Sequence, residues 1–425
     1  MAAVEDREAS RSHSERAEPA GGLGPAQPTL LRDINERVVF DTIRALHPIS
    51  RAEVARRTGL SKPTVSLAIR TLEASGLVAD VGVESGRSGR AGVLVSPVVD
   101  AALAVGVEIE VGRVRATIVD LDGQVLAEHG IAVTRRTADA LFGSVVSCVD
   151  ALAGALGRPR SDIGAITVGS PGVIDPATGV LTQAGTLPEL DGTTPADELA
   201  ARLDCAVSVH NDVDLAALGE QAEGHGREAD SFVVLWVGSG LGAALVLNGR
   251  LHVGYRGGAG EIFDVPFRRA IESSALGSSA PPTTDAGVFD ASLAGTTALA
   301  RHLAPSHPRT ALEPPFDALA VLDAASTGDP LGVAVRDRLG RWVAWYAATV
   351  TAVIDPELVV LAGPLGSHDA LRTAVTAELD YLLAVPPRIA TSKLGDSAVL
   401  IGASSGACRD AADRAFNHRI LERDS

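Results

Sequence analysis

The chain has 425 residues, of which 46% are hydrophobic and 21% are charged, and its formal net charge is −16. This length favours two or three domains that each bury a core, and the composition is typical of a soluble protein. No run approaches the roughly 18 to 20 apolar residues that cross a bilayer, and residues 1–20 lack the apolar stretch of a secretory signal. The three cysteines have no metal-type spacing, which argues against a disulfide framework. We therefore expect a cytoplasmic protein without a membrane partner.

The negative charge is unevenly distributed along the chain. Residues 31–92 hold ten Lys and Arg against seven Asp and Glu, a net of +3, so the other residues carry −19. A mildly basic module on an acidic body is expected to bind nucleic acid through that module only. Residues 1–27 are rich in Glu, Arg, Ser, Gly and Pro and are predicted to be a disordered tail.

Residues 28–97 are predicted to form a winged helix-turn-helix. After a first helix with apolar residues at helical spacing, Ser50 and Glu53 form a capping box that begins a second helix. Gly59 then makes a tight turn, and Ser61 caps a third helix with an apolar stripe on one face and polar residues on the other. A strand, a Gly-Arg-rich turn and a further strand predict the wing.

The polar face of the third helix and the wing are expected to contact DNA. In a helix-turn-helix the second helix reaches base edges, and flanking Arg and Lys neutralise phosphates. The alternative is a helical hairpin with a solvated polar face. This alternative is disfavoured by the capped turn, the net positive charge of the module and the wing. The expected DNA-binding residues are Ser61, Lys62, Thr64, Ser66, Leu67 and Arg70 in the helix, and Arg87 and Arg90 in the wing.

After this module, strands and Gly turns alternate with Ala-rich helices, which predicts an α/β fold. Two apolar hairpins, at 105–129 and 232–253, each precede a helical region and a buried strand that ends in Gly. This internal doubling predicts two similar lobes around a cleft, over 98–206 and 207–399. A C-terminal helix over about 400–420 is expected to pack back on the first lobe.

Six short motifs follow the winged helix in a fixed order. They are Val105-Gly106-Val107-Glu108, Val168-Gly169-Ser170-Pro171-Gly172-Val173-Ile174-Asp175, His210-Asn211-Asp212-Val213-Asp214, Gly238-Ser239-Gly240-Leu241-Gly242, Gly258-Ala259-Gly260-Glu261-Ile262 and Val359-Val360-Leu361-Ala362-Gly363. In this order they resemble the ROK family of repressors, open reading frames and sugar kinases, and within it regulators of the xylose-repressor and N-acetylglucosamine-repressor type. The resemblance implies a two-lobed, actin-like (ribonuclease-H-like) fold with a carbohydrate site in the cleft.

The resemblance also implies roles for individual residues. Asn211 and Asp212 match the Asn that contacts sugar and the Asp that acts as general base in the family's kinases, although Asn-Asp is also a common turn former. Glu261 matches a glutamate that binds sugar hydroxyls, and Asp264 stands where the family has a zinc-bound His. We expect Asn211, Asp212 and Glu261 to converge on one pocket, with Asp264 adding negative charge beside them.

Three departures from the family pattern bear on chemistry. The kinases' D-I-G-G-T-K phosphate loop is replaced by residues 108–113, where Glu110 and Val111 stand in place of glycines and a carboxylate would repel a triphosphate. We therefore expect no nucleotide cofactor. The zinc-binding His and cysteines of the family are absent as well, so we expect no metal. The family's P-N-L-P segment, whose Asn touches sugar, has Thr186 at the Asn position.

The leading hypothesis is a transcription regulator, more specifically a repressor, that binds operator DNA as a homodimer or dimer of dimers. A sugar in the cleft would change the spacing of two DNA-binding heads. One alternative is an ATP-dependent sugar kinase that uses Asp212 as base, which Glu108, Glu110 and Val111 disfavour. The other is a ligand-blind DNA-binding scaffold, which Thr186 and Asp264 favour.

Overall fold

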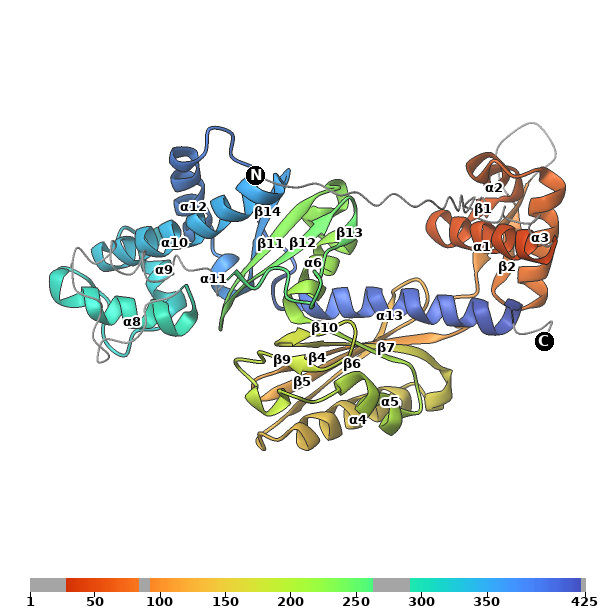
Figure 1. Cartoon of the computed structure of the whole chain (residues 1–425), viewed down its shortest axis with the longest axis horizontal. Helices are drawn as coiled ribbons and strands as arrows, with labels where there is room; N and C mark the ends of the chain where they lie inside the picture. Colours follow the sequence, from red (N-terminus) through yellow and green to blue (C-terminus); the bar gives the residue numbers. More distant parts are fainter. Residues whose placement is uncertain (1–27, 84–91, 263–290, 422–425) are drawn as a thin grey trace, which may run out of the picture. The chain divides into compact units, whose positions relative to one another are not determined.

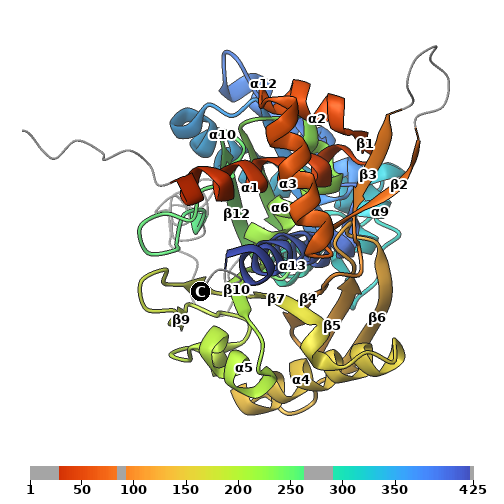
Figure 2. The same cartoon turned by 90° about the vertical axis from the view of Figure 1, so that its right-hand side faces the viewer.

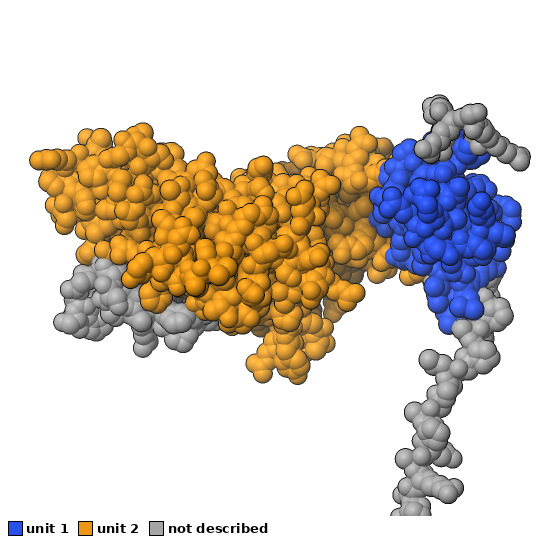
Figure 3. Space-filling model, turned by 90° about the horizontal axis from the view of Figure 1, so that it is seen from above, with its two compact units in different colours: residues 1–97, 424 blue, residues 98–423, 425 orange. Residues whose placement is uncertain are grey.

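The computed structural model describes residues 28–83, 92–262 and 291–421, and the chain divides into two compact units, one up to Pro97 and one from Val98 onward (Figure 3). The predicted tail, the wing residues Arg87 and Arg90, and Asp264 lie outside the described residues.

The first unit is a winged helix-turn-helix, as the sequence predicts (Figure 2). Three helices pack together over a small antiparallel sheet of order β1-β3-β2. The core between them is apolar and includes Phe40, Ile43 and Leu72, none of which is exposed. The elements are α1 (Pro28–Leu46), β1 (Ile49–Ser50), α2 (Arg51–Thr58), α3 (Lys62–Ala74), β2 (Val78–Val83) and β3 (Val93–Pro97).

Local signals set the boundaries of these helices. The Ser50 side chain accepts a hydrogen bond from the Glu53 N–H at 3.3 Å and caps α2. Gly59 ends α2 with a φ of 71°, a left-handed conformation that glycine adopts without steric cost. The Ser61 side chain accepts from the Thr64 N–H at 3.3 Å and caps α3.

The first lobe of the second unit is a five-stranded sheet of order β10-β7-β4-β5-β6. Helices α4 and α5 cover one face and α13 lies across the other (Figure 1). Because β4 and β7 are covered on both faces, they are almost entirely buried. The elements are β4 (Leu103–Glu110), β5 (Arg113–Val119), β6 (Val125–Ala132), α4 (Ala138–Ala155), β7 (Ile163–Ser170), a small hairpin of β8 (Val173–Ile174) and β9 (Leu181–Thr182), α5 (Pro195–Leu203) and β10 (Val207–Asn211).

The second lobe is another five-stranded sheet, of order β13-β12-β11-β14-β15. Helix α6 packs on one face, and α8, α9, α10 and α12 form the larger core on the other. The elements are α6 (Asp212–Glu223), β11 (Phe232–Val237), β12 (Leu241–Leu247), β13 (Arg250–Leu251), α8 (Leu293–Leu303), α9 (Ala318–Ser326), α10 (Pro330–Ile354), β14 (Leu358–Ala362), α11 (Gly363–Gly366), α12 (Asp369–Leu382) and β15 (Arg388–Thr391).

Helix α13 (Ala398–Phe416) joins the two lobes. It packs on β4 and β7 of the first lobe and on α6 of the second. Small residues allow this close approach: a Cβ on Gly402 would overlap the backbone carbonyl oxygen of Leu215, and a Cβ on Gly106 would lie 2.5 Å from Ser404 Oγ. The crossing of α6 and α13 is therefore a contact between backbones.

Among the described residues, α4 is long and apolar enough to cross a membrane, and α9 with α10 passes the same test as a pair bent by 107°. In this protein α4 buries Leu141, Phe142 and Val145 against the first-lobe sheet. It is therefore placed as a core helix.

Candidate functional site

The exposed face of α3 carries the residues expected to contact DNA. Lys62, Leu67 and Arg70 are exposed, while Thr64 and Ser66 are half-buried. The Ser61 hydroxyl lies 2.8 Å from Thr64 Oγ1 and caps the helix, so this side chain orients α3. The opposite face is part of the core and consists of Val65, Ala68, Ile69 and Leu72.

Two cations next to α3 were missed by the sequence reasoning. Arg56 and Arg57 lie in the last turn of α2 with side chains 75% and 60% exposed, and both pair with Glu53. They precede the turn that leads into α3, where flanking cations contact phosphates in helix-turn-helix proteins. Their signal in the sequence was the Arg-Arg pair just before Thr58-Gly59.

A cavity of about 270 Å³ lies in the second unit between its two lobes. β4 and β5 contribute charged side chains from the first lobe, and the second lobe contributes the start of α6 and the end of β11. The lining residues used below are Glu108, Glu110, Arg113, Arg115, Asp212, Trp236 and Asp396. Asp212 is thus the predicted ligand residue that faces this cavity.

Two arginines of β5 hold the carboxylates of β4 in place. Arg115 donates to Glu108 Oε2 at 2.5 Å, to Glu110 Oε1 at 3.0 Å and to the backbone carbonyl of Asp396 at 2.7 Å. Arg113 donates to Glu110 Oε2 at 2.8 Å. The Glu110 carboxylate is therefore fixed beside the turn that joins β4 to β5.

Burial and like charges raise the pKa values of three acids around the cleft. Burial, and then the carboxylate of Glu110, raise the pKa of Glu108 to about 8, although Arg115 acts in the opposite direction. Burial raises the pKa of Asp212 to about 6. Burial, Asp212 and Glu261 together raise the pKa of Asp214 to about 7. These carboxyl groups compete for protons near neutral pH.

Asn211 has a structural task. Its side-chain oxygen accepts from the N–H groups of Val213 and Asp214, at 2.8 and 3.3 Å, and caps α6. Its Nδ2 donates to the Gly172 carbonyl at 3.0 Å. Both ends of the amide therefore bond to backbone, and Asn211 lines neither the cavity at Asp212 nor the hollow at Glu261.

Glu261 lines a separate hollow of about 670 Å³ beside the hairpin of β8 and β9. Gly260 precedes it with a φ of 95°, and a Cβ there would overlap the Ala243 carbonyl oxygen, so only glycine fits. The structure therefore does not bring Asp212 and Glu261 into the one pocket that the sequence predicts, although the charges of both contribute to the raised pKa of Asp214. The hollow is lined by Val173, Asp175, Thr178, Val180, Thr182, Gln183, Arg256, Gly258 and Glu261.

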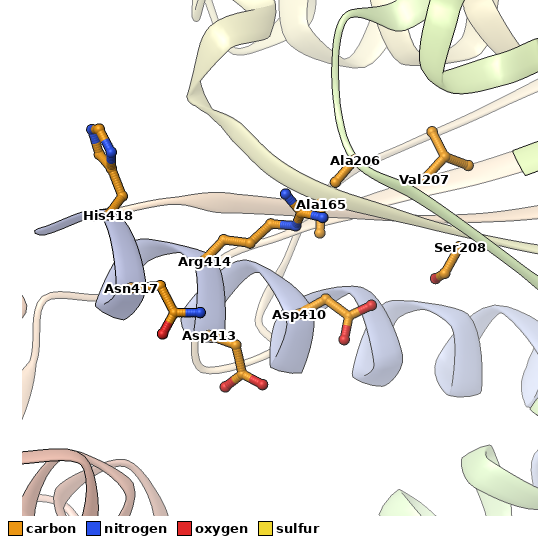
Figure 4. A pocket seen from close by; sticks show the side chains of 9 residues that line it. All are labelled: Ala165, Ala206, Val207, Ser208, Asp410, Asp413, Arg414, Asn417 and His418. Atoms are coloured by element: carbon orange, nitrogen blue, oxygen red, sulfur yellow. The ribbon is translucent and has the colours of Figure 1, made fainter. Parts of the chain in front are cut away.

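Gln183 in this hollow was not predicted. Its φ of 56° is unusual for a residue with a side chain and occurs often at binding sites. A third hollow of about 630 Å³, also unpredicted, lies between β10 and the C-terminal half of α13, where Arg414 reaches toward Ala165 and Ala206 (Figure 4). Within the described ranges, no group of three or more His, Cys, Asp or Glu could hold a metal ion.

Comparison with known proteins assigns both units. The winged helix-turn-helix DNA-binding family matches residues 47–79, and the ROK family matches residues 104–409. The chain belongs to the ROK family. Its second unit is the ROK domain, with the actin-like kinase fold that the sequence predicts.

Relatives of this ROK protein include regulators. The DNA-binding transcriptional dual regulator NagC of Escherichia coli (strain K12) is 24% identical over 354 residues, which cover 83% of this chain and 85% of NagC. The xylose repressor of Bacillus subtilis (strain 168) is 24% identical over 240 residues, 56% of this chain and 61% of the repressor.

Solved structures with this fold include both a regulator and a kinase. A ROK family transcriptional regulator, a homologue of the E. coli MLC protein, superposes with a TM-score of 0.74 at 20% identity and covers 92% of this chain and 99% of its own. A ROK family glucokinase from Streptomyces griseus, in complex with glucose and AMPPNP, superposes with a TM-score of 0.59 at 21% identity. The match covers 72% of this chain and 100% of the glucokinase. The fold therefore fits either activity, and individual residues must decide between them.

Proposed function

We propose that this ROK protein is a DNA-binding transcription regulator, a repressor, whose kinase-like unit binds a sugar without transferring phosphate. The observation that carries the proposal is the polar, exposed face of α3 on a winged helix in the same chain as a ROK domain. Lys62 and Arg70 supply cations on that face, and Ser66 and Thr64 supply hydroxyls at its edge.

The fixed carboxylate at the β4–β5 turn supports the absence of phosphotransfer. Val111 and Gly112 form the turn, and Glu110 is held beside it by Arg113 and Arg115. A nucleotide phosphate at this turn would meet a carboxylate that is already paired and cannot rotate away without losing its hydrogen bonds. Asp212 and Glu261, in their two hollows, are the groups that we propose contact the sugar.

Regulation requires that the sugar changes DNA binding. We propose that two copies bind a two-fold symmetric operator, and that sugar in the cleft alters the spacing of their heads. The backbone contact between α6 and α13 favours this route, because α6 begins at Asp212 in the cleft and α13 spans the first lobe. A movement of α6 on ligand binding at Asp212 would therefore be passed to α13 through their close backbone contact.

The test is selection of binding sites from random double-stranded DNA by the full-length protein. The matched control carries Lys62→Ala and Arg70→Ala, both on the exposed face of α3. We expect an enriched site with two-fold symmetry, bound by the wild type and not by the control, and released on addition of a sugar. Equal enrichment by the control would contradict the assignment of α3.

One observation favours a second function, sugar phosphorylation. Asp212 faces the cleft with its pKa raised to about 6, and such a carboxylate is suited to act as a general base. Incubation with Mg-ATP and hexoses tests it. Sugar phosphate formation that disappears in Asp212→Asn would establish a kinase and overturn the proposed loss of phosphotransfer.

A further inference from the structure

The charge of the cleft limits what can bind there. Four carboxylates and two guanidinium groups line the cavity between the lobes. The hollow at Glu261 adds Asp175 and Glu261 against Arg256, which is exposed. Carboxylates therefore outnumber cations in both places, and a bound ligand is surrounded by net negative charge.

The two guanidinium groups of the cavity are already engaged. Arg113 bonds to Glu110, and Arg115 bonds to Glu108, Glu110 and the Asp396 carbonyl. A phosphate or carboxylate on the ligand would have to break one of these charge-assisted bonds to gain a cation. It would also lie against acids that already repel one another. Both the loss of arginine hydrogen bonds and the repulsion from the acids weaken the binding of an anionic sugar.

We infer that the ligand of this cleft is an amine-bearing sugar, bound as its ammonium cation between Glu108 on β4 and Asp212 on α6. The inference rests on the proposed function, that a sugar binds in the cleft. An ammonium group donates three hydrogen bonds and can satisfy carboxylates from both sides. Because Glu108 belongs to the first lobe and Asp212 to the second, a cation between them attracts both lobes and favours a closed cleft.

The protonation of Glu108 provides a second consequence. The groups that face it are Glu110 on its own strand, Arg113 and Arg115 on β5, Asp212 on α6 and Asp396 before α13. With its pKa raised to about 8, the Glu108 carboxyl is mostly protonated at pH 7 in the empty cleft. A bound ammonium stabilises the ionised form, so binding should release a proton. If the ligand lowers this pKa from about 8 to about 7, it binds the ionised form about tenfold more tightly than the protonated form. At pH 7 this linkage raises the overall affinity about twofold and releases about half a proton.

The experiment compares matched sugars by isothermal titration calorimetry with the full-length protein. Glucose, galactose and mannose are each tested as the parent sugar, the 2-amino-2-deoxy sugar and the 6-phosphate. We expect an amino sugar to bind several-fold more tightly than its parent, and the phosphates to bind more weakly than the parent sugars. A parent sugar or phosphate that binds as tightly as its amine overturns the inference and leaves sugar sensing intact. Binding of none of them contradicts the proposed sensing itself.

Proton release is measured by repeating the titration at pH 7 in two buffers with different enthalpies of ionisation. The wild type should release about half a proton, whereas Glu108→Gln should release almost none and prefer the amine less strongly, because only Asp212 remains to attract it. Asp369→Asn, an acid whose side chain is 85% exposed on α12, is the control and should behave like the wild type. Tight amine binding by the wild type without proton release would refute the placement beside Glu108, whether or not the Gln variant folds.

Discussion

Replacing Glu108 by Gln should make the stability of the second unit less dependent on pH. Glu108 is 5% exposed, and its pKa is raised from 4.5 to about 8 by burial and by Glu110. Between these two values the folded state holds a proton that the unfolded state has released. The wild type therefore loses stability as pH rises through this window, and the loss is complete above the folded-state pKa.

The size of the effect follows from the shift. At 1.36 kcal/mol per pKa unit, Glu108 costs the folded state about 1 kcal/mol at pH 5 and about 4 kcal/mol at pH 8. The variant also loses stability for reasons that do not depend on pH, such as the missing bond from Arg115 to the Glu108 carboxylate. Such a loss is the same at both pH values and cancels when they are compared. The free energy of unfolding of the variant, minus that of the wild type, should therefore rise by about 3 kcal/mol between pH 5 and pH 8.

Urea unfolding followed by tryptophan fluorescence measures this difference. The three tryptophans, Trp236, Trp342 and Trp345, all lie in the second unit, so the signal reports on that unit. Asp369→Asn removes an exposed carboxylate and should leave the pH profile unchanged. Parallel pH profiles for Glu108→Gln and the wild type would refute a buried, protonated Glu108.

Three further changes test other parts of the structure. Arg70→Ala should weaken binding to the selected DNA site by about 1 to 3 kcal/mol if a base contact is lost, and a gel-shift titration that shows no change would remove Arg70 from the interface. Gly402→Ala should destabilise the second unit by about 1 to 3 kcal/mol in urea unfolding, because the methyl group would overlap the α6 backbone. Gly143→Ala on α4 meets no atom within 4 Å and should be neutral or stabilising, and an equal loss in both would contradict the close crossing. Chelators should leave the midpoint of unfolding unchanged, because the described residues contain no group of three or more potential metal ligands and the three cysteines of the chain lie far apart in the sequence. A lower midpoint with a chelator would indicate a structural metal.

Features that depend on neighbouring residues were predictable from the sequence. Ser50, Gly59 and Ser61 set the ends of α2 and α3 through contacts three or four residues away, so their residue types alone predict the turn. The existence of two lobes was predictable because each repeats a hairpin, a helical region and a strand that ends in Gly. The predicted boundary at residue 207 was wrong, because β10 (Val207–Asn211) pairs with β7 in the first-lobe sheet. The order of the motifs added the family and the fold.

Features that depend on distant residues were not predictable. The bond from Arg115 to the Asp396 carbonyl joins residues 281 positions apart, and no local pattern indicates it. The family resemblance assigns Asn211 to a ligand, and that role stays a prediction; in this structure its amide bonds to the α6 backbone and to Gly172. Asn is both a common ligand residue and a preferred helix cap, and only the contacts distinguish the two.

The same substitution that disfavours phosphotransfer also explains how the cleft could serve a regulator. In a kinase fold, glycines in the first turn leave room and backbone N–H groups for phosphate. Here Glu110 ends the strand before that turn and is held by two arginines, one of which also bonds to Glu108, whose proton is retained near neutral pH. A cation in the cleft would favour ionisation of Glu108 and would attract carboxylates from both lobes. If such a ligand binds closed lobes more tightly than open ones, that difference in affinity is what shifts a conformational equilibrium.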